Sequence, residues 1–492
     1  MHARTAVLRM TSLALACAVA PAWAATWPKL DPALQTSATA RAVVVEAMVE
    51  MNHQADSLLL DRSAGVVERR AAWMKMLQAT ADRSQADLVD YLKARRVEYQ
   101  SFWINNTLWV RATPQVLQSI SQRTDVNFVY ADTALPQPLP QTRPDNGALR
   151  AVEWGVNKIR APLVWAAGVR GAGVTVAGQD TGVRWDHAAL KAKYRGWNGS
   201  IANHNYNWHD AIHSGAVASC PSNSTTPCDD NDHGTHTVGT MVGAAGTNQI
   251  GVAPDAKWIA CRNMKSGVGT PSTYTECMQW FLAPTNSANA SPDPSKAPDI
   301  INNSWGCPTS EGCTPRTILQ SAVNALVDGG IFFVVSAGND GSGCGTITDP
   351  PAVYQKSFTI GSTTSSDALS SFSSRGPVSG ATFNKPDAVA PGSSVRSSLK
   401  NGSYGSMSGT SMAGPHVAGA AALLISAYPS LRGHPDQIGD LLRSTAVHVS
   451  STQVCGGIPS TNFPNPVQGD GRIDVYAAYQ AAALLFAKDQ AE

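Results

Sequence analysis

The sequence contains an acid, a histidine and a serine, each within a run of small residues, and together these groups could carry out nucleophilic acyl transfer. The runs are, in chain order, Asp180-Thr181-Gly182-Val183, His233-Gly234-Thr235-His236 and Gly409-Thr410-Ser411-Met412-Ala413. A serine hydroxyl becomes a strong nucleophile when an imidazole accepts its proton, and a carboxylate orients that imidazole. The three runs therefore predict a serine peptidase with Asp180, His233 and Ser411 as its catalytic residues.

Other ionisable residues near these runs compete for the same roles. His236 has an i, i+3 spacing from His233 that occurs in metal sites, but no third ligand is evident, so His236 and His416 are expected to pack within helices. Four carboxylates are expected to be solvated loop residues or at most cation ligands: Asp186, Asp229, Asp230 and Asp232. Asp180 is preferred because it lies just past the end of an apolar strand and precedes Thr-Gly.

The elements that must position these residues alternate between strands and helices from about residue 150. Short apolar runs predict strands over 174–177, 257–262, 299–303 and 331–335, and Thr314 with Pro315 predicts the start of a helix that ends at Gly329-Gly330. This alternation is typical of an α/β fold with a mainly parallel sheet covered by helices on both faces. Ligands bind at the carboxyl ends of such strands, where Asp180, the run 304–306 and the run 336–339 all fall.

The region from residue 25 to residue 145 is richer in charged residues than the rest and contains no cysteine, and it predicts a small separate domain. Strands are expected at 42–49, 97–104, 108–112 and 126–130, with helices at 66–81 and 114–122 and a turn at Asn105-Asn106. Ser84-Gln85-Ala86-Asp87 resembles a capping box that opens a further helix. The resulting βαββαβ order is that of a ferredoxin-like module. A Pro/Gln-rich tract from Leu135 to Gly147 follows and is expected to be an extended, exposed, cleavable linker.

The first 24 residues have the pattern of a secretory signal. Arg4 and Arg9 precede an apolar run from Leu13 to Pro21, and Ala22-Trp23-Ala24 fits a cleavage site after Ala24. This run is far shorter than the about 20 apolar residues of a membrane anchor. Lipid attachment at Cys17 is disfavoured, because alanine rather than the usual leucine stands three places before it. The protein is therefore expected to be secreted, with no membrane association after signal removal.

Composition and charge narrow the function further. The chain has 492 residues, 43% of them apolar and 15% charged, which describes a globular protein. Its 37 basic and 36 acidic residues give a net charge of +1, so no overall field attracts nucleic acid or anionic lipid. Protein and peptide substrates are the expected partners, with no cofactor for the chemistry, and the chain is expected to act as a monomer.

Removal of Cys17 with the signal leaves an even number of cysteines, which in an exported chain predicts disulfides. They are Cys220, Cys228, Cys261, Cys277, Cys307, Cys313, Cys344 and Cys455. Eight cysteines allow 105 pairings, among which the sequence alone does not choose. Proximity favours Cys220 with Cys228 and Cys307 with Cys313, then more weakly Cys261 with Cys277, which leaves Cys344 with Cys455.

Residues 150 to 480 resemble the subtilisin-type serine peptidases, whose triad occurs in the order acid, histidine, serine. Further matching motifs are Ser371 to Pro377, Lys385-Pro386-Asp387, Ala390-Pro391-Gly392 and Gly469 to Asp474. Within the family the chain looks most similar to the bacillopeptidase F type, from Trp154 to Lys158 onward. Residues 25 to 135 resemble the inhibitory propeptide of these enzymes, which implies a partner segment that helps the catalytic domain to fold and is then removed by self-processing. The implied organisation is a signal peptide over 1–24, a propeptide domain with its linker over 25–145 and a catalytic domain over 146–492.

The resemblance also implies roles for two loops. Asn339 matches the asparagine of the oxyanion hole, and Ser304-Trp305-Gly306 matches the segment that binds substrate as an added strand. Three features depart from the family pattern: the residues Cys307 to Cys313 beside the specificity pocket, the long segment 195–230, and the short stretch 246–254 where many relatives carry a calcium loop. The residue preference of the specificity pocket is therefore not inferred from the family. Structural calcium elsewhere stays compatible with the sequence, with no ligands assigned.

Two other classes of protein fit the sequence less well. An inactive, peptidase-like binding protein is disfavoured because every position needed for the chemistry is filled. An esterase of the α/β-hydrolase type requires Gly-x-Ser-x-Gly and the order serine, acid, histidine, and neither is present.

Overall fold

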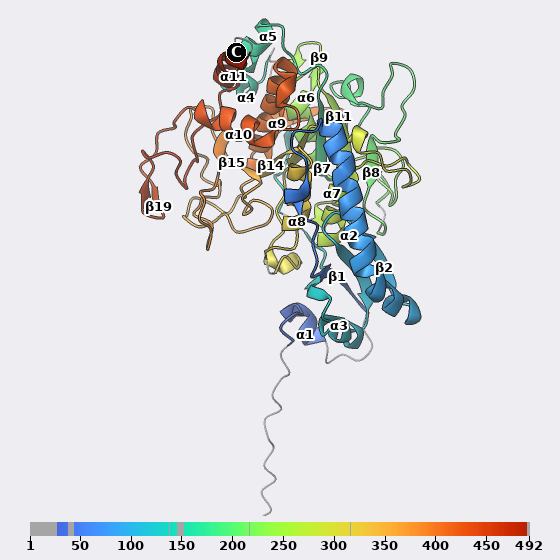
Figure 1. Ribbon diagram of the computed structural model, residues 1–492. Coiled ribbons are helices and arrows are strands. Elements are labelled where there is room, and N and C mark those ends of the chain that lie inside the picture. Colours follow the sequence, from blue (N-terminus) through green and yellow to red (C-terminus); the bar gives the residue numbers. More distant parts are fainter. Residues whose placement is uncertain are drawn as a thin grey trace, which may run out of the picture.

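Seven parallel strands form the central sheet of the protein in the computed structural model, which describes residues 27–37, 44–136, 138–144, 152–215, 217–314 and 316–489 (Figure 1). All neighbouring pairs run parallel. In spatial order the strands are β16 (Ala388–Pro391), β15 (Phe358–Thr363), β14 (Phe332–Ser336), β13 (Ile300–Asn303), β7 (Thr175–Asp180), β11 (Lys257–Arg262) and β8 (Trp208–Asp210). The four strands predicted in this region are β7, β11, β13 and β14, which confirms the α/β fold class.

Helices cover both faces of this sheet. Successive residues of a strand point to opposite faces, so each strand contributes side chains to two separate cores. Val176 and Ile300 belong to one core, and their neighbours Ala177 and Ile301 belong to the other. The first core contains residues of α4 (Trp154–Lys158), α5 (Ala161–Ala166), α6 (His233–Val242), α9 (Thr410–Ala427), α10 (Pro435–Ser444) and α11 (Val475–Asp489). The second contains residues of α7 (Pro271–Leu282) and α8 (Gln320–Asp328).

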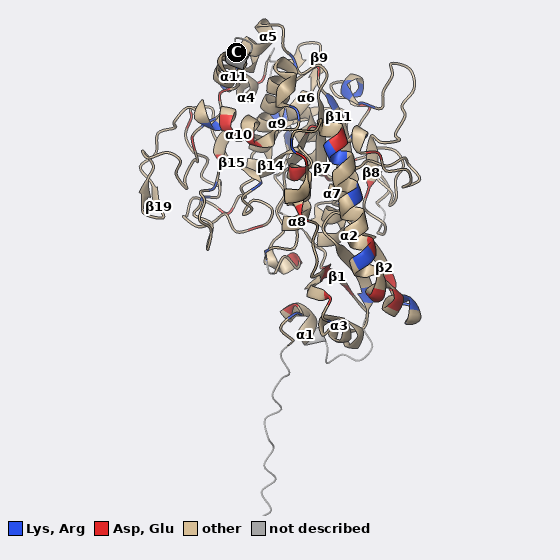
Figure 2. Cartoon of the chain, in the orientation of Figure 1, with Lys and Arg blue, Asp and Glu red and all other residues tan. Residues whose placement is uncertain are grey.

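Helix α9 lies at the centre of the first core and carries no Lys, Arg, Asp or Glu (Figure 2). Most of its side chains are buried on every side, including the run Val417 to Ile425. A helix that is apolar all round is one that other elements surround. The helix that carries Ser411 in its first turn is therefore fixed rigidly against the sheet.

Short elements complete the domain around this sheet. They include the hairpins β9 (Ala244–Ala245) with β10 (Asn248–Gln249), β17 (Val395–Ser398) with β18 (Tyr404–Met407), and β19 (Val454–Cys455) with β20 (Ile458–Pro459). The 3-10 turns are η1 (Ser57–Leu59), η2 (Lys191–Lys193), η3 (Pro294–Lys296), η4 (Thr309–Glu311) and η5 (Pro429–Leu431). No helix in the described ranges is both long enough and apolar enough to span a membrane.

The predicted start of the helix before β14 is wrong. Helix α8 begins at Gln320, residues 316–319 form turns, and Pro315 lies outside the described residues. The Tyr354 hydroxyl donates to the carbonyl of Arg316, 2.6 Å away, and accepts the backbone N–H of Leu319 at 3.3 Å. This side chain supplies partners that a first helical turn would otherwise need.

A four-stranded antiparallel sheet forms the N-terminal module, in the order β2 (Glu98–Phe102), β3 (Thr107–Ala112), β1 (Val45–Met51), β4 (Val126–Ala131). Helices α2 (Val66–Ala94) and α3 (Pro114–Ser121) join the strands into the predicted βαββαβ order, and α1 (Pro32–Ser37) precedes them. The predicted turn at Asn105-Asn106 connects β2 to β3. Residues 42 and 43 of the first predicted strand lie outside the described residues.

The predicted capping box at Ser84 is wrong, because α2 is one continuous helix of 29 residues. The Ser84 hydroxyl donates to the carbonyl of Thr80, four residues earlier, at 2.8 Å. A serine in the interior of a helix commonly satisfies its hydroxyl in this way instead of capping a new helix.

The N-terminal module packs against α7 and α8, with α2 running along that side of the sheet (Figure 1). Arg70 donates to the carbonyls of Gly329 at 2.9 Å and Pro298 at 3.1 Å, and the Trp73 indole donates to Ala325 at 3.0 Å. Carbonyls at the end of a helix lack partners within that helix. The module therefore supplies a donor to Gly329, the C-cap residue of α8, and a second donor to Ala325, whose carbonyl also accepts the N–H of Gly329.

A second contact between the module and the rest of the protein centres on the buried Glu276 of α7. Its carboxylate accepts hydrogen bonds from His209 at 2.7 Å, from His213 at 2.9 Å and from Gln100 of the module at 3.1 Å. The bond to Glu276 raises the pKa of His213 to about 9. Burial alone would raise the pKa of Glu276, but the hydrogen bonds from His209 and His213 lower it to about 2.

We expect replacement of His213 by glutamine to lower stability in a pH-dependent way. The pKa of His213 is about 9 in the folded protein and about 6.5 in the unfolded chain. The charge of His213 therefore stabilises the fold fully below a pH of about 6.5, and this stabilisation is lost as the pH rises through about 9. The difference in thermal unfolding midpoint between wild type and His213→Gln should therefore shrink between these pH values. A difference that stays constant or grows over this range would contradict the assigned ion pair.

Four disulfides join the eight cysteines: Cys220–Cys228, Cys261–Cys277, Cys307–Cys313 and Cys344–Cys455. The first three are the pairs that proximity favoured, and Cys344–Cys455 is the pair that these three left over. The first three close loops of 6 to 16 residues, and Cys344–Cys455 links positions 111 residues apart. A cross-link over a long loop removes more conformational freedom from the unfolded chain.

Candidate active site

Asp180 and His233 meet at the carboxyl edge of the central sheet. Strand β7 ends at Asp180 and helix α6 begins at His233, and both side chains are buried. The His233 Nδ1 donates to the Asp180 carboxylate, with distances of 2.8 and 2.9 Å to its two oxygens. Its Nε2 has no hydrogen-bond partner in the described part of the chain. The imidazole is thus oriented from one side, with its second nitrogen available.

The glycines in these runs allow the strand and the helix to approach each other. A Cβ atom at Gly234 would lie 2.1 Å from the carbonyl oxygen of Gly182. Gly182 itself has a φ of +105°, and a Cβ there would lie 1.9 Å from the carbonyl oxygen of Cys228. Any larger residue at either position would separate Asp180 from His233.

Asp229 connects the two elements that carry Asp180 and His233. Its carboxylate accepts the Thr181 hydroxyl at 2.9 Å, the backbone N–H of Thr235 at 3.0 Å and the Thr235 hydroxyl at 2.5 Å. It also accepts the backbone N–H groups of Asn231 and Asp232. Asp229 is only 5% exposed, so the expectation of a solvated carboxylate is wrong.

The other three carboxylates have separate surroundings. Asp186 is ion-paired to Arg184 near the surface, and Asp232 accepts the backbone N–H of Lys400. Asp230 pairs with Arg262 at 2.5 Å and is buried, which also contradicts the expectation of a solvated loop residue. Among the described residues, none of these three carboxylates forms a hydrogen bond with the His233 imidazole.

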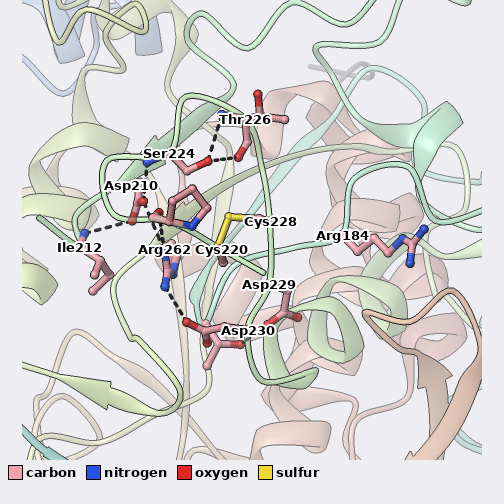
Figure 3. Close-up of a disulfide and its surroundings, with 12 residues drawn as sticks. Arg184, Asp210, Ile212, Cys220, Ser224, Thr226, Cys228, Asp229, Asp230 and Arg262 are labelled. Atoms are coloured by element: carbon pink, nitrogen blue, oxygen red, sulfur yellow. Dashed lines mark hydrogen bonds and ion pairs between the residues drawn. A yellow bond between two sulfur atoms is a disulfide. The ribbon is translucent and has the colours of Figure 1, made fainter. Parts of the chain in front are cut away.

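The loop before His233 is held in place by Arg262 and a disulfide (Figure 3). The fully buried Arg262 guanidinium lies 3.4 Å from the Asp210 carboxylate and 2.5 Å from that of Asp230. Cys220–Cys228 closes the same loop directly before Asp229. A buried charge is tolerated when it is paired in this way. The long segment 195–230 thus ends in a fixed support for α6.

We expect Asp229→Asn to lower kcat by about 10²-fold, the effect of a displacement of about 1 Å in catalytic geometry. All five contacts of Asp229 come from N–H or O–H donors, so an amide NH2 group would face a donor and break the connection. Steady-state kinetics with a peptide substrate would measure this loss. Asp186→Asn is the matched control, and equal kcat values for the two variants would show that Asp229 does not position the site.

Ser411 lies in the first turn of α9 and contacts the loop that follows β13. Its hydroxyl donates to the carbonyl of Ser304 at 3.0 Å, and the Ser304 hydroxyl donates to the carbonyl of Ser411 at 2.9 Å. The Ser411 hydroxyl therefore does not bond to His233 in this rotamer, in agreement with the unpartnered Nε2 of His233. Rotation about the Cα–Cβ bond is the movement that redirects a serine hydroxyl.

Asn339 follows β14 and lies beside the start of α9. Its side-chain oxygen accepts the backbone N–H of Thr410 at 2.9 Å and the Thr410 hydroxyl at 3.1 Å. This use of the oxygen leaves the Nδ2 amine as the donor of the Asn339 side chain. An amide donor therefore lies next to the residue that precedes Ser411.

A cleft of about 410 Å³ adjoins Ser411. Its wall includes Ser304, Gly306, Gly338, Asn339, Asp349 and Ser411. The Trp305 ring is buried, stacks on Tyr274 with centroids 3.8 Å apart, and donates to the carbonyl of Gln179 at 3.0 Å. The structure thus groups Ser304, Trp305, Gly306, Asn339 and Ser411 at one cleft, and sequence reasoning missed Asp349.

The Pro-rich tract crosses this cleft instead of forming a free linker. Strand β5 (Leu135–Pro136) pairs with β12 (Val268–Gly269), and β6 (Arg143–Pro144) pairs with β18. Between them, Pro138, Leu139 and Pro140 line the cleft. We call residues 135–136 and 138–144 the crossing segment. The expected boundary at 145/146 lies outside the described residues.

His236 and His416 are buried packing residues, as predicted. The His236 Nε2 bonds to the carbonyl of Val395 at 3.0 Å, and the His416 Nδ1 bonds to that of Met412 at 2.8 Å. Burial lowers the pKa of His236 to about 3 and that of His416 to about 4, so both stay neutral at ordinary pH. Within the described ranges, no group of three or more His, Cys, Asp or Glu is arranged to hold a metal ion.

Comparison with known proteins identifies relatives over most of the chain. The profile of the peptidase S8 subtilase family matches residues 171–471. Bacillopeptidase F of Bacillus subtilis (strain 168) is 37% identical over 450 residues, which are 87% of this chain and 30% of that protein. Subtilisin E of the same organism is 33% identical over 308 residues, 62% of this chain and 68% of that protein. Subtilisin Savinase of Lederbergia lenta is 33% identical over 311 residues, 62% of this chain and 96% of that protein.

Proposed function

This chain belongs to the peptidase S8 subtilase family, and from that premise we propose that it is a secreted serine endopeptidase made as a self-processing precursor. Asp180, His233 and Ser411 form its catalytic triad. The observation that carries this proposal is the hydrogen bond between His233 and Asp180 at the sheet edge, with the second imidazole nitrogen left without a hydrogen-bond partner among the described residues.

In the proposed mechanism, the Ser411 hydroxyl rotates from the Ser304 carbonyl toward the Nε2 of His233. His233 accepts the hydroxyl proton while the Ser411 oxygen attacks the carbonyl carbon of the scissile bond. Asp180 keeps the Nδ1 proton of His233 in place and stabilises the imidazolium that forms. His233 then donates the proton to the leaving amine, and water releases the acyl group from Ser411 by the same steps.

The negative oxygen of the tetrahedral intermediate is stabilised by Asn339 and by the start of α9. The Nδ2 amine of Asn339 and the backbone N–H of Ser411 are the two proposed donors. The N-terminus of α9 adds partial positive charge at the same place. Because Ser411 belongs to a buried helix and Asn339 is hydrogen-bonded to the first residue of that helix, these groups need little rearrangement when the charge develops.

The substrate is proposed to bind as an added strand along residues 304–306. The position of the crossing segment supports binding at this place, because its residues 138–140 line the cleft that Ser304 and Gly306 also line, so a length of main chain fits there. Peptide and protein substrates provide the backbone N–H and C=O groups that strand addition requires.

Residues 25–145 are proposed to act as an inhibitory propeptide that precedes a catalytic domain over 146–492. Two observations support this role. The module packs on α7 and α8, and the crossing segment lines the cleft beside Ser411. A segment in that position would exclude substrate until it is cut and released.

Secretion is proposed from the signal pattern of residues 1–24, which lie outside the described residues. The four disulfides support it, because structural disulfides persist in oxidising compartments. Bound calcium is compatible with the domain, and we assign it no ligand and no part in the chemistry.

The test of the proposed function is hydrolysis of an unstructured protein by the purified, matured chain. We expect peptide fragments whose new ends are free amines and carboxylates, and their loss after treatment with a serine-directed phosphonate. A substrate that stays intact with fully folded enzyme, or hydrolysis that resists the phosphonate, would contradict the proposal.

A further inference from the structure

The cleft beside Ser411 contains two carboxylates and no Lys, Arg or His among its described lining residues. Asp349 belongs to the loop after β14, and Asp340 directly follows Asn339. The remaining surface is formed by small or apolar groups such as Gly306, Ala337 and Ala352. A substrate side chain in this cleft therefore meets negative charge and no positive charge.

Asp349 lies against the segment proposed to bind substrate. A Cβ atom built on Gly306 would be 3.2 Å from the Cβ of Asp349 and 3.7 Å from its Oδ2. The absence of a side chain at Gly306 thus leaves the Asp349 carboxylate open toward the cleft. Its Oδ1 accepts the Thr348 hydroxyl at 3.0 Å, and no ion pair with Asp349 is found among the described residues.

The Asp349 carboxylate is partly removed from water. Burial raises its pKa, and the charge of Asp340 raises it further, whereas the hydrogen bond from Thr348 and the charge of Arg316 lower it. Arg316 does not line the cleft. An apolar substrate side chain would remove this carboxylate further from water and provide no partner for its charge. A cationic side chain would pair with the carboxylate instead.

We propose that Asp349 makes this cleft select arginine or lysine as the residue that contributes the carbonyl of the scissile bond. The inference rests on the proposed function and adds a substrate class to it. A guanidinium or ammonium group would reach the carboxylate of Asp349 at the end of the cleft, and its carbon stem would contact Gly306 and Ala352. Asp340, which is exposed at the rim, contributes a weaker long-range attraction.

The alternative to arginine or lysine before the scissile bond is an apolar residue, and the crossing segment is the observation that could favour it. Pro138, Leu139 and Pro140 line the same cleft, and none of them carries a charge. Proline at two of these three positions is poorly suited to productive binding as an extended strand. The segment therefore fits the role of an occupant that blocks the cleft better than that of a model substrate.

The test is a set of peptides that differ only in the residue before the scissile bond: arginine, lysine, citrulline and leucine. Citrulline has the shape of arginine without its charge. We expect kcat/KM of the matured wild-type protein for arginine to exceed that for citrulline by at least about 30-fold, the lower range for a buried charge pair. The Asp349→Asn variant should lose most of this ratio, and Asp340→Asn should lower it only a few-fold.

The control is Asp436→Asn, an exposed carboxylate in the first turn of α10 and outside the cleft, which should leave the arginine-to-citrulline ratio unchanged. Equal wild-type rates for arginine and citrulline, or faster cleavage after leucine, would overturn the assignment of Asp349 while leaving the peptidase function intact. Because this comparison uses the wild-type protein, it holds even if Asp349→Asn does not fold. Absence of cleavage of every peptide by folded protein would instead overturn the proposed function.

Discussion

Replacement of Ser411 by alanine is expected to reduce peptide hydrolysis by about 10⁶-fold, the size measured for the same removal in subtilisin. The alanine has no oxygen to form the acyl-enzyme, so only binding and the oxyanion donors remain to stabilise the transition state. In addition, the precursor should stay uncut between about residues 136 and 150, because its own active site is proposed to make that cut. Kinetics and intact-mass measurement of the variant, produced in a protease-free host, test both effects.

Ser426→Ala is the matched control for this variant, because Ser426 lies in the same helix and donates only to the carbonyl of Ala172 at 2.9 Å. It should mature and cleave peptides as the wild type does. Normal maturation of Ser411→Ala in the absence of other proteases would contradict self-processing. Retention of hydrolysis by Ser411→Ala would contradict the assignment of the nucleophile itself.

Replacement of Asp180 by asparagine is expected to lower kcat by about 10⁴-fold with little change in KM. An asparagine keeps the shape of the side chain, but only one of its two terminal atoms is an oxygen that can accept the Nδ1 proton of His233, whereas both Asp180 oxygens lie within hydrogen-bond distance of Nδ1. The neutral amide also cannot stabilise the charge of the imidazolium. The imidazole would then adopt the tautomer that cannot accept the Ser411 proton. Thermal unfolding of the variant shows whether the fold is retained, and a loss of less than tenfold in a folded variant would exclude Asp180 as the orienting acid.

Local patterns were sufficient to predict the elements that carry the site. Apolar runs followed by Asp180, Ser304 or Ser336 placed these residues at strand ends, and the parallel sheet brings such ends to one edge. His416, which was expected to pack within a helix, likewise lies buried in helix α9. These features depend on residues close together in the chain, so they can be recognised without tertiary contacts.

The errors arose where a distant residue decides the local structure. Tyr354 replaces the first turn of α8, and its hydroxyl comes from a position more than thirty residues after that turn. Asp229 stands only four residues before His233, yet its role depends on Thr181 of another element. A buried aspartate and a solvated one look alike in a polar loop sequence, because burial is set by the packing of the whole domain.

The path of the Pro-rich tract was also beyond prediction from local signals. Its composition indicates an extended backbone, and extended residues pair with any strand edge that the fold presents. The edges concerned are β12 and β18, which lie more than a hundred residues further along the chain. Only the presence of Pro138, Leu139 and Pro140 in the lining of the cleft beside Ser411 shows that this tract crosses the cleft.

The central claim is that Ser411 is the nucleophile activated by His233 and Asp180, and covalent labelling tests it most directly. The matured protein is treated with a serine-directed phosphonate, digested, and sequenced by tandem mass spectrometry. The account predicts a single adduct on the peptide that contains Ser411, and none in the Asp180→Asn variant under the same exposure. An adduct on any other residue of the wild-type protein, with Ser411 unmodified, would contradict it.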